Sequence, residues 1–165
     1  MRFYGLALLA SAAVLGACGG GENKAADTTK APPAAAPTPA PAATGGAVAP
    51  IAATGDTITI KMISDDKGYR FDPANITAKS GQALKFVMVG AGGPHNVAFD
   101  PATIPADVKD QLFANMPNAT DGSSPMFMNP NEAWTLSLGN IKPGKYPFHC
   151  TPHLAMGMKG EITVQ

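Results

Sequence analysis

The residues with the strongest capacity for chemistry lie in one stretch near the C-terminus, residues 146–158. Within it, Cys150, His153 and Met158 place a thiol, an imidazole and a thioether close together. The 165-residue chain contains only three histidines, and one of them, His95, lies far upstream. A thiolate, two imidazoles and a weakly bound thioether form the ligand set of a blue-copper electron-transfer site. The residue types therefore point to a mononuclear copper site.

The same residues also admit other roles. A buried cysteine can be a plain apolar thiol. A cysteine near a histidine can be a nucleophile, but no orienting carboxylate or oxyanion turn accompanies Cys150. A structural zinc site prefers Cys and His ligands, whereas this loop offers thioethers. Two methionines, Met156 and Met158, compete as the axial ligand.

Two segments resemble those of a known family. Cys-Thr-Pro-His-Leu-Ala-Met-Gly-Met at 150–158 is similar to the ligand loop of the cupredoxins, the small type 1 copper proteins, and most of all to that of plastocyanin and pseudoazurin. Gly-Pro-His-Asn-Val-Ala-Phe-Asp at 93–100 resembles the first-histidine segment of that family. The resemblance covers residues 58–164. The family spacing, with His three residues after Cys and Met five after His, implies that one copper ion is bound by His95, Cys150, His153 and Met158.

The resemblance carries further expectations. It implies a one-electron carrier that cycles between Cu(I) and Cu(II), and not an enzyme. Met156 would then pack beside the site, and Asn96 would support it by hydrogen-bonding to the backbone of Cys150 and Thr151. His149 departs from the plastocyanin pattern, where a tyrosine usually precedes the cysteine, so a plastocyanin-type docking partner is not implied. Its imidazole is either a lateral electron route or an exposed histidine without a special role.

Two other functions could use the same ligands. A copper-binding module for storage or delivery must release its metal readily, so copper exchange kinetics distinguish it from a redox carrier. A detached domain of a multicopper enzyme would need histidines for a second metal, and only His149 is left over.

Alternation around Cys150 predicts how the ligands are held. Tyr146, Phe148 and Cys150 share one face of a strand, which points Cys150 inward and His149 outward, and Pro152 ends that strand. Residues 69–73 are expected to form a loop or a short edge segment. Similar patterns predict one helix at 103–116 and further strands at 58–62, 75–79, 83–89, 95–99, 126–128, 132–138 and 160–165. Many short strands predict an all-β fold, a Greek-key β-sandwich with one short helix, which the resemblance also implies.

The N-terminal third predicts export and anchoring. Residues 1–18 combine Arg2 with an apolar run too short to cross a bilayer, as in a signal peptide. Leu-Gly-Ala-Cys at the end of this run resembles the bacterial lipoprotein box, which implies lipidation of Cys18 and a membrane anchor. Residues 19–55 are rich in Ala and Pro without apolar periodicity, which predicts a disordered, flexible tether. Residues 56–165 are then a plastocyanin-like copper-binding domain.

The charge balance narrows the choice of partners. Twelve basic residues offset twelve acidic ones, so nothing favours nucleic acid or a charged membrane surface. The sequence carries no phosphate-binding loop and no dinucleotide-binding glycine motif. The export signal and the lipobox-like cysteine predict a location outside the cytoplasm of a bacterium, in the periplasm or at the outer cell surface, and the protein is expected to be a monomer. Its expected partners are redox proteins.

Overall fold

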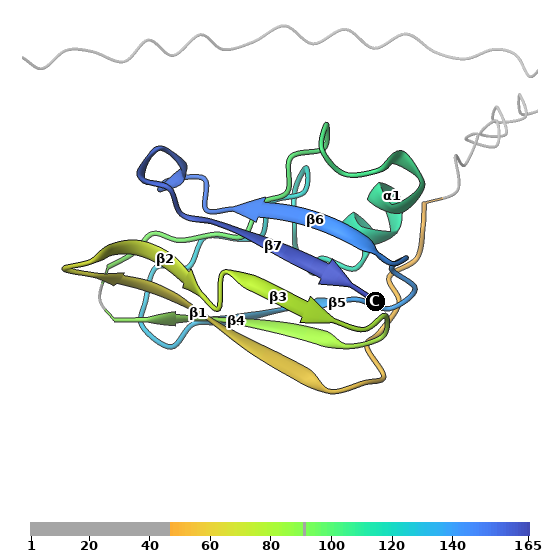
Figure 1. Ribbon diagram of the computed structural model, residues 1–165, viewed down its shortest axis with the longest axis horizontal. Coiled ribbons are helices and arrows are strands. Elements are labelled where there is room, and N and C mark those ends of the chain that lie inside the picture. The colour runs from red at the N-terminus through yellow and green to blue at the C-terminus, as the bar shows by residue number, and fades with distance from the viewer. Residues whose placement is uncertain (1–46, 91) are drawn as a thin grey trace, which may run out of the picture. The chain divides into compact units, whose positions relative to one another are not determined.

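Two β-sheets face each other across an apolar core (Figure 1). The computed structural model describes residues 47–90 and 92–165. The first sheet has the strand order β2-β1-β4-β5, and the second has the order β3-β7-β6. The strands are β1 (Thr57–Asp65), β2 (Gly68–Asp72), β3 (Asn75–Ala78), β4 (Ala83–Val89), β5 (Ala133–Ser137), β6 (Gly144–His149) and β7 (Lys159–Val164). The predicted all-β sandwich with one short helix is confirmed.

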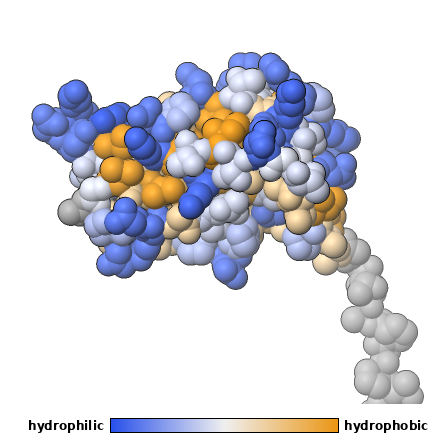
Figure 2. Space-filling view, turned by 90° about the horizontal axis from the view of Figure 1, so that it is seen from below, coloured by the Kyte–Doolittle hydropathy of each residue, from blue (hydrophilic) through white to orange (hydrophobic). Residues whose placement is uncertain are grey.

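Period-two alternation explains both faces of the first sheet. Ile60 and Met62 on β1 are fully buried, while Lys61 between them is exposed. On the neighbouring β4, Phe86 is fully buried and Lys85 is exposed. Figure 2, seen from below the view of Figure 1, shows a surface on which hydrophilic and hydrophobic residues are mixed. The inward side chains thus build the core, and the outward ones meet water.

Aromatic rings fill the centre of the sandwich. Phe71 from β2 packs edge-to-face on Phe148 from β6, with ring centroids 4.7 Å apart. Phe86 from β4 contacts both rings in T-shaped geometry. Edge-to-face pairs at such separations are favourable because the positive edge of one ring meets the negative face of the other. The strand that precedes Cys150 is thereby fixed to the opposite sheet.

The segments around 95–99 and 126–128 differ from the predicted strands. Only isolated bridges form there: His95 pairs with Phe127, and Ala98 pairs with both Ser123 and His149. The backbone N–H of Val97 donates to the Ser124 hydroxyl oxygen rather than to the backbone of a neighbouring strand. Because successive residues take partners from different segments, no continuous ladder develops. The apolar pattern reflects burial in the core, not membership of a sheet.

The helix α1 (Ala106–Ala114) is shorter than the predicted 103–116. Pro105 is its N-cap, and Thr103 before it is held in a turn by the Asp100 carbonyl. Val108 and Leu112 are the buried residues of the helix, as the apolar stripe predicts. No helix among the described residues is long and apolar enough to cross a membrane.

Residues 49–55, which we call the N-terminal strap, are bonded to the domain although the sequence assigns them to the tether. The Ile51 N–H donates to Asn115 Oδ1 at 2.8 Å, and the Ser137 hydroxyl donates to the Ile51 carbonyl at 2.6 Å. The N–H groups of Thr54 and Gly55 both donate to the Gly81 carbonyl. The structured part therefore begins before residue 56. The predicted signal peptide, Cys18 and residues 19–46 of the tether lie outside the described residues.

Candidate metal centre

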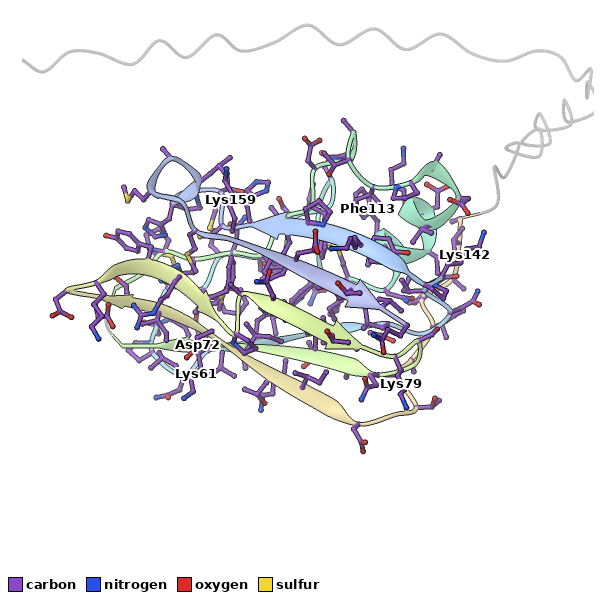
Figure 3. All side chains as sticks on the ribbon, in the orientation of Figure 1. Lys61, Asp72, Lys79, Phe113, Lys142 and Lys159 are labelled. Atoms are coloured by element: carbon purple, nitrogen blue, oxygen red, sulfur yellow. The ribbon has the colours of Figure 1, made fainter. Side chains whose placement is uncertain are left out.

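Cys150 and Met158 lie at the two ends of one loop. Cys150 directly follows β6, and Met158 directly precedes β7, its antiparallel neighbour. The Cys150 N–H donates to the Met158 carbonyl at 3.0 Å, which closes the loop at its base. In Figure 3 the labelled Lys159 marks the end of the sandwich that carries this loop, and Lys79 and Lys142 mark the opposite end.

Short-range hydrogen bonds shape the loop itself. The His153 N–H donates to the Cys150 carbonyl, and the Met158 N–H donates to the His153 carbonyl at 3.1 Å. A short 3₁₀ turn, η1 (Leu154–Met156), lies between them and ends at Gly157, whose φ of 86° is a left-handed conformation that glycine adopts without strain. The backbone of His153 is thus hydrogen-bonded to both ends of the loop.

His95 reaches the same place from a distant segment. Its N–H donates to the Phe127 carbonyl at 3.1 Å, and its carbonyl accepts the Phe127 N–H at 2.8 Å. Gly93 lies just before it, where a Cβ would come within 2.8 Å of the Met88 side chain and 3.2 Å of the Phe127 carbonyl. Glycine there allows the backbone to approach closely enough to bring His95 inside.

Three of the four predicted ligands form a compact buried cluster. Cys150 Sγ lies 3.6 Å from Nδ1 of His95 and 3.4 Å from Nδ1 of His153. The ligand atoms of these three residues all lie within 4.8 Å of one another. His95 and Cys150 are fully buried, and His153 is 6 % exposed. A thiol and two imidazoles therefore converge on one point beneath the surface.

The two competing methionines differ sharply in exposure. Met158 is fully buried, whereas Met156 is 62 % exposed. An axial ligand must face the buried cluster, so the burial favours Met158 and is unfavourable to Met156. Met156 is largely exposed on the surface of the loop, so the expectation that it packs beside the site is wrong.

The electrostatics suit a metal that needs neutral imidazoles and a thiolate. Burial lowers the pKa of His95, and the neighbouring His153 lowers it further. Burial likewise lowers the pKa of His153 and raises the pKa of the Cys150 thiol. Both histidines are thus held neutral with lone pairs to donate, and Cys150 holds a proton that a metal must displace. The donor set fits copper, whose soft thiolate and imidazole ligands are all present.

Asn96 links the two ligand-bearing segments. Its Oδ1 accepts the Thr151 N–H at 2.7 Å, and its Nδ2 donates to the Thr151 hydroxyl at 3.1 Å. The side chain is 2 % exposed. The expected hydrogen bond to the backbone after Cys150 is therefore present, and a second bond to the Thr151 side chain accompanies it.

His149 points away from the cluster, as the strand alternation predicts. Its backbone pairs with Ala98, while its half-buried ring lines a surface groove of about 500 Å³ together with Asp100, Lys159 and Glu161. Burial lowers the pKa of its imidazole. The ring is one residue away from Cys150 but on the opposite side of the strand.

Tyr69 is the residue at this site that sequence reasoning missed. It lies on the edge strand β2, yet its ring stacks on His153 with centroids 3.7 Å apart and planes 9° apart. The sequence predicted only a loop or a short edge segment at residues 69–73, and the edge strand β2 confirms this prediction. Nothing local in the sequence links Tyr69 to a loop more than eighty residues away.

Comparisons with known proteins agree with this geometry. Residues 58–165 match the family described as copper binding proteins, plastocyanin/azurin family. Plastocyanin A/B of Petroselinum crispum is 38% identical over 106 residues, which cover 64% of this chain and 97% of that protein. Chloroplastic plastocyanin of Physcomitrium patens is 36% identical over 115 residues, 69% of this chain, and the match spans 61% of its own length. The structure of oxidized plastocyanin from Dryopteris crassirhizoma aligns with a TM-score of 0.50 and 29% identity, and covers 66% of this chain and 100% of that one.

Proposed function

Because this chain belongs to the plastocyanin/azurin family of copper-binding proteins, we propose that its folded domain carries single electrons between redox proteins. The cofactor is copper. The proposed ligands of one copper ion are His95, Cys150, His153 and Met158. The observation that carries the proposal is the buried convergence of Cys150 Sγ with two imidazole nitrogens at 3.4 and 3.6 Å.

Rigidity of the ligands supports a carrier. Bound copper would supply the couple between its two oxidation states, and the chain's own residues would hold it in place. Cys150 and His153 are fixed by loop hydrogen bonds, and His95 is fixed by its pairing with Phe127. Ligands that are already in place need little movement when one electron is gained or lost. Proteins of the plastocyanin family are electron carriers rather than enzymes, in keeping with this use of the site.

We propose that the protein works outside the cytoplasm, held to a membrane through lipidated Cys18, and meets redox proteins as a monomer. The support is the sequence alone: Arg2, the short apolar run and the lipobox-like end at residue 18. His149 in its surface groove is a candidate lateral route for the electron, since it directly precedes Cys150 in the chain.

Storage or delivery of copper is the second candidate function. The same soft ligands would serve it, but a delivery protein must release metal readily. The closed loop and full burial of His95 and Cys150 oppose fast release. A carrier is therefore the better-supported function.

The test combines a spectrum, a redox titration and a metal-transfer assay on the copper-loaded protein. We expect an intense visible band from thiolate-to-copper charge transfer, reversible one-electron reduction, and slow loss of copper to a chelator. Rapid transfer of copper to the chelator with irreversible redox behaviour would favour delivery instead. Absence of the visible band would exclude the proposed ligand set.

A further inference from the structure

The ring of Tyr69 covers the imidazole of His153. The two rings are nearly parallel, with 9° between their planes and 3.7 Å between their centroids, which is direct face-to-face contact. The same tyrosine meets His95 in an edge-on arrangement at 6.1 Å and 63°. Tyr69 therefore contacts one proposed copper ligand closely and approaches a second, although it belongs to neither ligand segment.

Tyr69 is held in position independently of the ligand loop. It follows Gly68, whose φ of 98° turns the chain between β1 and β2, and it pairs with Ser64 across that hairpin. Asp65 braces the turn, because its carboxylate accepts two hydrogen bonds from Arg70 at 2.7 and 2.8 Å and one from the Lys67 N–H at 2.9 Å. The Arg70 guanidinium lowers the pKa of Asp65 to about 2, so the brace stays charged in mild acid.

His153 needs an external support of this kind. The bonds that fix its backbone run to Cys150 and Met158 and leave the plane of the ring to packing. Its immediate successors on the loop do not shield it, since Leu154 is 40 % exposed and Met156 is 62 % exposed. Yet His153 itself is only 6 % exposed. The stacked phenol ring covers one face of the imidazole, while Cys150 Sγ lies 3.4 Å from its Nδ1 and the His95 ring centroid lies 4.8 Å from its own.

We propose that Tyr69 is a positioning residue for the copper ligand His153, an inference that rests on the proposed electron-carrier function. Its ring fixes the plane of the imidazole in both oxidation states and so limits ligand movement during electron transfer. It also favours the oxidised state. Cu(II) withdraws more electron density from an imidazole than Cu(I) does, and the more positive ring is attracted more strongly to the electron-rich face of tyrosine.

Two variants separate the ring from its hydroxyl. Tyr69→Leu removes the aromatic face and keeps apolar bulk, whereas Tyr69→Phe keeps the face and serves as the matched control. In Tyr69→Leu we expect an upward shift of the reduction potential and a several-fold slower electron self-exchange. In Tyr69→Phe both quantities should stay at the parent value. If Tyr69→Leu loses copper during purification, retention of copper by Tyr69→Phe supports the proposal, and equal loss overturns it.

A measurement on the metal-free protein tests the stack itself. The face of Tyr69 should shift the ring-proton NMR signals of His153 upfield in the parent and in Tyr69→Phe, and Tyr69→Leu should remove that shift. Absence of the shift in the parent would refute the stack. A Tyr69→Leu protein with unchanged potential and unchanged self-exchange would refute the positioning role, as would equal changes in the Phe and Leu variants. A parent protein without a visible band or redox couple would instead refute the electron-carrier function, because the NMR result does not depend on copper.

Discussion

Replacing Asn96 with alanine should uncouple the two segments that carry the proposed ligands. Asn96 lies directly after His95, and Thr151 lies directly after Cys150, so the side chain of Asn96 joins the two ligand segments. Alanine removes both hydrogen bonds and leaves the Thr151 N–H without its acceptor. The backbone of both segments otherwise keeps its partners, since His95 still pairs with Phe127 and Cys150 with Met158.

The size of the effect follows from those two bonds. Each intramolecular hydrogen bond contributes about 1 kcal/mol, and an unsatisfied donor adds a further penalty. Thr151 is an exposed residue and its two bonds to Asn96 are only partly buried, so the added penalty is at the low end. The free energy of unfolding of the metal-free protein should therefore fall by about 2 to 3 kcal/mol, and the midpoint of thermal unfolding by roughly 8–12 °C for a domain of this size.

Chemical denaturation of the metal-free protein is the suitable assay, because bound copper would itself connect the two segments. Thr151→Val is the matched control: it removes only the bond from Asn96 Nδ2 and should cost about 1 kcal/mol. The double variant Asn96→Ala/Thr151→Val should be no less stable than Asn96→Ala alone, because the Asn96→Ala change has already removed the partner of the Thr151 hydroxyl. A loss below about 0.5 kcal/mol for Asn96→Ala would refute the reasoning, because it would fall within the range of an ordinary surface substitution.

Four further predictions concern the metal and the anchor. Cys150→Ser should abolish the intense visible band while the sandwich stays folded by circular dichroism, because a hydroxyl is a poor copper ligand. Met158→Gln should keep copper and lower the potential measured by voltammetry, whereas the exposed Met156→Gln should leave it unchanged; the reverse result would reassign the axial ligand. Copper must displace the thiol proton of Cys150, whose pKa is raised by burial, so the apparent affinity for copper should rise about tenfold for each unit by which the pH increases through neutrality. A competition titration that gives the same copper affinity at each pH would contradict this. Cys18→Ala should shift the protein from the membrane fraction to the soluble fraction or block its processing, and equal membrane association would remove the lipoprotein hypothesis.

Local patterns in the sequence were sufficient for most of the sheets. β4 occupies 83–89 as predicted, and the alternation of Tyr146, Phe148 and Cys150 correctly indicated which side chains face inward. Periodicity works here because each strand has one buried and one exposed face. It failed at residues 95–99, where an apolar segment is buried without forming a ladder.

Contacts between distant segments were harder to predict. The close approach of His95 to Cys150 was anticipated only through a family resemblance, not from the residues between them. The Tyr69–His153 stack was missed because β2 gives no pattern that specifies what lies over its edge. The strap was missed because its Ala- and Pro-rich composition resembles the tether, and its attachment depends on partners such as Asn115 and Gly81 supplied by other elements.

The strap determines where a mechanical load enters the domain. Its bonds to Asn115, Ser137 and Gly81 lie at the end of the sandwich opposite the ligand loop (Figure 1). A pull on the chain at residue 47 is therefore transmitted first to α1, β5 and the turn before β4. The loop that holds Cys150 and His153 is outside that path of force. If residues 19–48 act as the proposed tether, a pull on them would reorient the domain without shearing the cluster of ligands, and the opposite end would stay free to meet the proposed redox partners.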